Sequence, residues 1–102
     1  MTVQRNAARV LQYLYLIRWK WPAYEHVRET VRMDESELIK ALEFLEDNDA
    51  IVMEQSMVGR PTDLALTESG MALVKDEQRF RDLFGESPNL DAIRVRYDLD
   101  ED

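Results

Sequence analysis

Apolar residues recur at helical spacing in four stretches of the chain, and this pattern predicts four helices. Residues three, four and seven positions apart share one face of a helix, so each stretch implies one buried face. The predicted helices cover about residues 5–19, 23–32, 35–48 and 68–85. Asp34 precedes the third helix and Glu37 lies three positions further on, which is the spacing of a capping box. The buried stripe of this third helix is expected to contain Leu38, Ala41, Leu42 and Leu45.

The first predicted helix is apolar on nearly all sides of its C-terminal half. A helix of this kind is normally covered on more than one side. Because a chain of 102 residues forms one small domain, we expect a second copy of the chain to supply part of the cover. The expected homodimer interface combines this helix with the last predicted helix and contains Tyr13, Leu16, Trp19, Leu73, Phe80 and Phe84.

A different spacing follows the third helix. Residues 51–57, which begin with the apolar residues Ile51, Val52 and Met53, are predicted to form a strand, and residues 63–66 are expected to form the return strand. Between them lies a predicted turn, in which Gly59 is free to adopt a positive φ and Pro61 fixes the chain. Thr67 is expected to cap the helix that follows.

The end of the chain has two interpretations. Ile93, Val95, Tyr97 and Leu99 alternate with charged residues, which fits a third strand or an extended tail. We therefore divide the chain into a domain over residues 1–85 and an extended acidic tail, or single strand, over residues 86–102.

The order of these elements resembles a winged helix-turn-helix domain. Over about residues 5–84 the sequence is similar to the broad MarR-, PadR- and ArsR-like group of prokaryotic transcriptional regulators. In that group the third helix ends in Leu-x-x-Leu before a polar corner, and the wing contains Gly-Arg-Pro and closes with Leu-Thr-x-x-Gly. The matching residues here are Leu42, Leu45, Asn48-Asp49-Ala50, Ile51-Val52, Gly59-Arg60-Pro61, Leu64 and Leu66-Thr67-Glu68-Ser69-Gly70. Ala50 stands where the group usually has a glycine.

The resemblance implies an α+β, mostly helical fold with a two-stranded wing and an added C-terminal helix. It also implies a sequence-specific DNA-binding transcriptional regulator that acts as a homodimer. Its recognition helix would cover about residues 35–48 and its wing about residues 57–64. The residues expected to contact double-stranded DNA are Arg28, Arg32, Ser36, Lys40, Gly59 and Arg60.

The distribution of charge supports an alternative. The formal net charge is −8, with 21 acidic and 13 basic residues. Residues 34–58, which include the recognition helix, contain one base and eight acids, whereas residues 1–33 contain six bases and two acids. Because an acidic surface repels phosphate, the chain could instead be an acidic winged-helix interaction module that binds a basic protein, or mimics the charge of DNA, and does not bind DNA.

Several candidate residues also have purely structural interpretations. Arg28 and Arg32 flank Glu25 and Glu29 at helical spacing, so they could form only exposed ion pairs. Arg60 could pair with Asp63 across the turn. The aromatic residues Tyr13, Tyr15, Trp19, Trp21 and Tyr24 could line an effector pocket, or they could pack in the core or a dimer interface.

Catalysis has no support in the sequence. There is no Ser-His-Asp or Cys-His arrangement, no phosphate-binding glycine loop and no HExxH motif. Cysteine is absent and His26 is the only histidine, so we expect no metal and no cofactor. No run approaches the ~18 apolar residues of a membrane span. We expect a cytoplasmic, non-enzymatic protein with no membrane partner.

Overall fold

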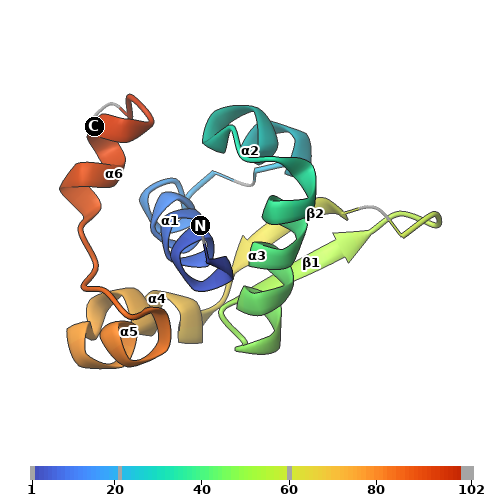
Figure 1. Cartoon of the computed structure of the whole chain (residues 1–102). Helices are drawn as coiled ribbons and strands as arrows, with labels where there is room; N and C mark the ends of the chain where they lie inside the picture. Colours follow the sequence, from blue (N-terminus) through green and yellow to red (C-terminus); the bar gives the residue numbers. More distant parts are fainter. Residues whose placement is uncertain (1, 21, 60, 100–102) are drawn as a thin grey trace.

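The helices and strands follow the order expected for a winged helix and continue into further short helices at the C-terminal end (Figure 1). The computed structural model describes residues 2–20, 22–59 and 61–99. This part of the chain contains six helices and a two-stranded antiparallel sheet. In chain order they are α1 Val3–Leu16, α2 Tyr24–Val31, α3 Glu35–Asp47, β1 Ile51–Gln55, β2 Pro61–Leu66, α4 Glu68–Lys75, α5 Glu77–Phe84 and α6 Leu90–Arg96. None of these described helices combines the length and the apolar character needed to cross a lipid bilayer.

Helix α1 lies at the centre of the fold, between α3 on one side and α6 on the other (Figure 1). Its predicted apolar stripe is buried. Tyr13 and Leu16 are also buried, because α6 packs against them from the opposite side. The rings of Tyr13 and Tyr97 meet edge to face, with 5.5 Å between their centroids. Helix α6 of the same chain therefore covers the side of α1 that a second copy was expected to cover.

This packing corrects the predicted homodimer interface. Of its six residues, five are buried within one chain: Tyr13, Leu16, Leu73, Phe80 and Phe84. Phe80 and Phe84 pack against each other with 4.5 Å between ring centroids. These five side chains are core residues and present no surface to a partner, so only Trp19, which is 62% exposed, stays available for such a contact.

The segment predicted as a strand or an extended tail contains helix α6, so that interpretation of residues 86–102 is wrong for residues 90–96. Asn89 caps the helix by accepting a hydrogen bond of 3.1 Å from the N–H of Ala92. The alternating pattern was misleading because only part of it faces the core. Ile93 is 6% exposed, while Val95 is 83% exposed.

The corner between α3 and β1 needs a left-handed residue, and Asp49 supplies it with φ +59°. The N–H of Ala50 donates to the carbonyl of Leu45 and the N–H of Asp49 donates to that of Glu46, which is a Schellman arrangement. Asp tolerates this conformation better than most residues with a side chain. Asp49 thus takes the place of the glycine that was expected at the corner.

The sequence Leu66-Thr67-Glu68-Ser69-Gly70 joins the wing to α4 as predicted. The Thr67 hydroxyl accepts from the N–H of Gly70 at 2.9 Å and donates to the carbonyl of Asp49 at 2.5 Å. A Cβ added to Gly70 would overlap the carbonyl oxygen of Ala50. The glycine is therefore required by the close approach of two backbone segments.

The helix predicted over residues 68–85 is divided in two. Asp76 has φ −106° and ψ 95°, which ends α4. Its side chain accepts from the N–H of Arg79 at 3.2 Å and so caps α5. The break changes the direction of the chain and brings Phe84 against Phe44 of α3, with 6.1 Å between ring centroids.

Candidate nucleic-acid interface

Helices α2 and α3 form the helix-turn-helix, and a short turn joins them. Arg32 ends α2 in the left-handed region, with φ 52°, and this residue redirects the chain toward α3. The buried stripe of α3 is the predicted one, since Leu38, Ala41, Leu42 and Leu45 are all 0% exposed. The opposite face of α3 consequently points to solvent and contains Ser36, Lys40, Glu43 and Asp47.

The start of α3 does not use the predicted capping box. Asp34 occupies the N-cap position, but its side chain makes no capping hydrogen bond. The hydroxyl of Ser36 instead donates to the Asp34 carboxylate at 2.6 Å, and this hydrogen bond lowers the pKa of Asp34. Glu37 does not reach back to the cap either. Its carboxylate accepts from the Asn6 side-chain amide on α1 at 3.1 Å.

Arg28 on α2 lies between two carboxylates. Its guanidinium is 3.2 Å from Glu25 on the same helix and 3.8 Å from Glu35 at the start of α3. The side chains of Arg28 and Glu35 are both 43% exposed, so the group lies at the surface. The structural interpretation of Arg28 is therefore confirmed for its pair with Glu25, and the contact to Glu35 also links the two helices of the motif.

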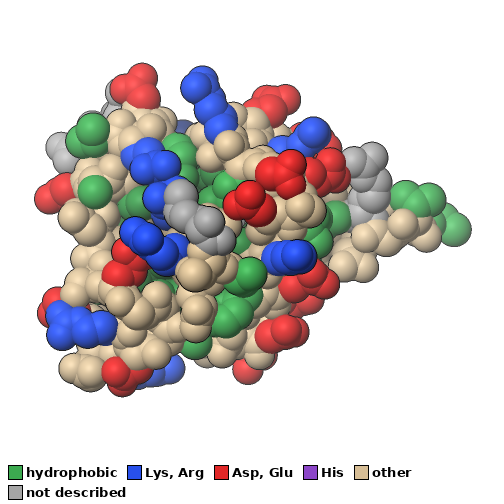
Figure 2. All heavy atoms as spheres, viewed as in Figure 1, with side chains coloured by type: hydrophobic (Ala, Val, Ile, Leu, Met, Phe, Trp, Pro, Cys, Tyr) green, Lys and Arg blue, Asp and Glu red, His purple; other side chains and the backbone are tan. Residues whose placement is uncertain are grey.

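Arg32 and Lys40 differ from Arg28 in having no carboxylate nearby among the described residues. Both side chains are exposed, and among the described residues neither lies within ion-pair distance of a carboxylate. The structure thus brings three of the predicted cations to α2 and α3, of which two have no acidic partner in the described chain. Figure 2 shows basic and acidic side chains interspersed over this face rather than separated into patches.

The wing is an antiparallel hairpin that projects from the body beside α3 (Figure 1). Its strands pair from Ile51 with Leu66 to Gln55 with Pro61, with an irregularity between Glu54 and Gln55. An isolated bridge joins Ala23 to Asp63, which lies in the outer half of β2. This bridge ties the wing to the segment that leads into α2.

At the tip of the wing, Gly59 has φ +82°, as predicted for this turn. Its N–H donates to the carbonyl of Ser56 at 2.9 Å. Arg60, the predicted wing contact, and its suggested pair with Asp63 lie outside the described residues. Met57 and Val58 were not among the predicted site residues, yet both are apolar side chains exposed at the tip. The sequence does contain a signal for them, because two adjacent apolar residues stand directly before a turn glycine.

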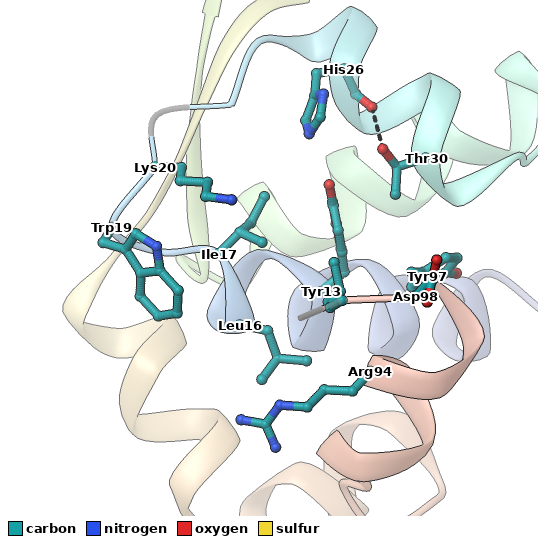
Figure 3. A pocket seen from close by; sticks show the side chains of 11 residues that line it. Tyr13, Leu16, Ile17, Trp19, Lys20, His26, Thr30, Arg94, Tyr97 and Asp98 are labelled. Carbon is teal, nitrogen blue, oxygen red and sulfur yellow. Dashed lines mark hydrogen bonds between the residues drawn. The ribbon is translucent and has the colours of Figure 1, made fainter. Parts of the chain in front are cut away.

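A groove of about 560 Å³ opens on another face, between the C-terminal end of α1, α2 and α6 (Figure 3). Of the aromatic residues considered for a pocket, Tyr13 and Trp19 line it, whereas Tyr24 is buried in the core. Trp21 lies outside the described residues. Burial raises the pKa of the Tyr13 phenol, whose ring stands on the floor of the groove below Thr30 (Figure 3).

No protein-family model matches the sequence, and no curated protein matches it either. The structure is similar to the crystal structure of a MepR mutant from a multidrug-resistant S. aureus clinical isolate, with a TM-score of 0.59 and 21% sequence identity. The similarity covers 78% of this chain but only 55% of the MepR chain, so this chain spans little more than half of its neighbour's length. MepR is a MarR-family winged-helix regulator. The predicted winged-helix fold is therefore confirmed.

Proposed function

We propose that the chain is a DNA-binding transcriptional regulator whose helix α3 enters the major groove of double-stranded DNA. One observation supports this proposal most directly. Ser36 and Lys40 lie one turn apart on the exposed face of α3, and the described chain offers Lys40 no carboxylate partner. In a helix-turn-helix this is the face that meets the base edges. A lysine there can donate to guanine O6 and N7, and a serine hydroxyl can contact either base of a pair.

The acidic residues of α3 repel phosphate, but those near its N-terminal end have partners within the chain, whereas those near its C-terminal end have none among the described residues. At its N-terminal end, Glu35 is close to Arg28 and Glu37 is held by Asn6 of α1. The acidic residues without such contacts in the described chain, Glu43, Glu46 and Asp47, lie toward the C-terminal end of the helix. Recognition helices contact bases mainly through their N-terminal residues, so the remaining carboxylates would lie away from the groove.

Arg28 and Arg32 are placed to contact the phosphate backbone. The preceding helix of the motif crosses the backbone, and Arg32 stands at the turn between the two helices. For Arg28, binding to phosphate requires exchange of its contacts with Glu25 and Glu35. Exposed ion pairs are worth only about 0–1 kcal/mol, so this exchange is not costly.

We extend the proposal to a homodimer that reads two half-sites about one DNA turn apart, and to sequence-specific binding. The predicted interface is mostly core, so the contact between copies must use another surface. Trp19 is the one member of the predicted interface that is exposed. Its indole, beside the guanidinium of Arg18 at 5.5 Å from the ring centroid, would be buried in such a contact.

The test compares duplex binding by matched variants. Arg32→Ala combined with Lys40→Ala removes two exposed cations from the proposed interface, and Lys75→Ala removes one exposed cation from α4. Using duplexes that the wild-type chain selects from a randomised pool, we expect the double variant to lose affinity at least about tenfold and the control to bind like wild type. Equal binding by all three proteins would show that Arg32 and Lys40 do not contact DNA and would contradict the proposed docking. No duplex bound at low salt, with a basic protein captured instead, would favour the acidic interaction module.

A further inference from the structure

The described residues at the tip of the wing, 56–59, carry no charge, and two of them, Met57 and Val58, are apolar, although 33% of the chain is charged. Met57 is 106% exposed and Val58 is 81% exposed, so neither side chain folds back onto the body. In Figure 2 the apolar side chains of this tip stand clear of the molecule at the end of the hairpin. Burying such side chains in a complex would remove a large apolar area from water.

The backbone of the hairpin places these two residues in the turn. Strand pairing continues out to Gln55 and Pro61, and the hydrogen bond from Gly59 to Ser56 closes the turn beyond them. The chain therefore presents Met57 and Val58 at the far end of a paired hairpin.

We propose that Met57 and Val58 form an apolar wedge that enters the minor groove of DNA and partly unstacks one base step. This inference rests on the proposed DNA binding. Proteins that bend DNA insert apolar side chains, methionine among them, between base steps from the minor groove. The wing would then recognise how easily a sequence deforms, and flexible pyrimidine–purine steps would be preferred under the tip.

Charge favours DNA over a basic protein as the occupant of the tip. Between Glu54 and Asp63 the sequence contains one charged residue, Arg60, so this segment has a charge of +1 in a chain of net charge −8. A basic protein would be attracted to the acidic residues of α3 instead. The tip is the part of the wing that a polyanion repels least.

The wedge also fits the shortage of unpaired cations on α3. With few groups available to neutralise phosphate, a gain in affinity from buried apolar area does not add to the salt dependence. Removal of the wedge should therefore weaken binding at every salt concentration by the same factor. Removal of a phosphate contact should instead change the slope of affinity against salt.

The experiment uses the full chain and duplexes that the wild-type protein selects from a randomised pool, labelled at both ends with a fluorescence energy-transfer pair. The test variant combines Met57→Ser with Val58→Ser, and the matched control is Val95→Ser, an equally exposed apolar residue on α6. Both variants should keep the wild-type unfolding temperature, because exposed positions contribute little to stability.

We expect the double variant to lose affinity about tenfold or more, to lose most of the DNA bend, and to keep the wild-type salt slope. Val95→Ser should match wild type in affinity, in DNA bend and in salt slope. If the double variant binds and bends the selected duplex like wild type, the wedge is wrong and the proposed function stands. If the wild-type chain binds no duplex at low salt, the wedge and the proposed DNA binding are both wrong. If the double variant instead abolishes self-association of the chain, the tip is a contact between copies and the wedge is overturned.

Discussion

The side-chain oxygen of Gln12 accepts a hydrogen bond of 2.6 Å from the backbone N–H of Asn89 and so joins the middle of α1 to the start of α6. Gln12 is only 4% exposed, and its amide nitrogen donates to the carbonyl of Ala8 at 3.1 Å. Asn89 in turn caps α6. One buried amide thus fixes the helix that covers α1, on the side where a second subunit was expected.

Replacement of this amide should loosen α6. Gln12→Leu removes the acceptor of this part-buried hydrogen bond from the N–H of Asn89, and a typical intramolecular hydrogen bond contributes about 0.5–1.5 kcal/mol to stability. We expect a loss of that size in the free energy of unfolding, measured by urea denaturation. Gln78→Leu, at an exposed glutamine on α5, is the control and should change the stability by less than about 0.5 kcal/mol. Equal losses in the two variants would contradict the role given to Gln12.

Gly70 should tolerate no side chain. The Cβ of Gly70→Ala would meet the carbonyl oxygen of Ala50, a backbone atom that cannot turn aside. We expect a loss of about 2 kcal/mol or more in the free energy of unfolding, because overpacking forces the backbone to shift. Ser69→Ala, at the exposed neighbouring position, should be close to neutral by the same thermal or urea measurement. A stable Gly70→Ala protein would show that the wing and α4 can separate without cost.

Tyr13 should make stability fall at high pH. Burial raises the pKa of its phenol in the folded state, so the unfolded chain releases this proton at a lower pH than the folded chain does. The resulting stability is complete below the unfolded pKa of about 10 and is lost as pH rises through the folded pKa. Urea denaturation between about pH 8 and about pH 11 should show this loss in wild type and a shallower loss in Tyr13→Phe. Identical pH profiles would exclude a contribution from this group.

Trp19 should control the oligomeric state. If the chain forms a homodimer through this exposed indole, Trp19→Ala should shift the dissociation constant toward the monomer without changing the unfolding temperature of the monomer. Sedimentation equilibrium over a range of protein concentrations measures both species. A wild-type protein that stays monomeric at all concentrations would refute the homodimer, and a dimer unaffected by Trp19→Ala would place its interface elsewhere.

Local signals predicted the elements of the fold well where packing agreed with them. The stripe of α3 from Leu38 to Leu45 and the cap at Thr67 were confirmed, because a helical apolar face and a hydroxyl N-cap each have one dominant structural solution. The fold class followed from the order of these elements, and the similarity to MepR agrees with it.

Other features depended on contacts between distant residues. The alternation from Ile93 to Leu99 is typical of a strand. The segment is helical instead, with Ile93 buried and Tyr97 packed against Tyr13 of α1. Five of the predicted interface residues were apolar because the core needs them, and the sequence alone does not distinguish the inside of a domain from the inside of a dimer. The pairing of Glu37 with Asn6 joins positions 31 residues apart and leaves no local signal.

The most direct test of DNA recognition by this acidic winged helix is the slope of duplex affinity against salt. Fluorescence anisotropy with a selected duplex, from about 50 to about 200 mM KCl, gives this slope for wild type and for the variants. We predict a negative slope for wild type that becomes shallower by about 1 in Arg28→Ala and likewise in Arg32→Ala, because each variant removes one cation from the phosphate backbone. Lys75→Ala should leave the slope unchanged. A flat wild-type salt dependence, or no duplex binding at the lowest salt, would contradict DNA recognition by this domain.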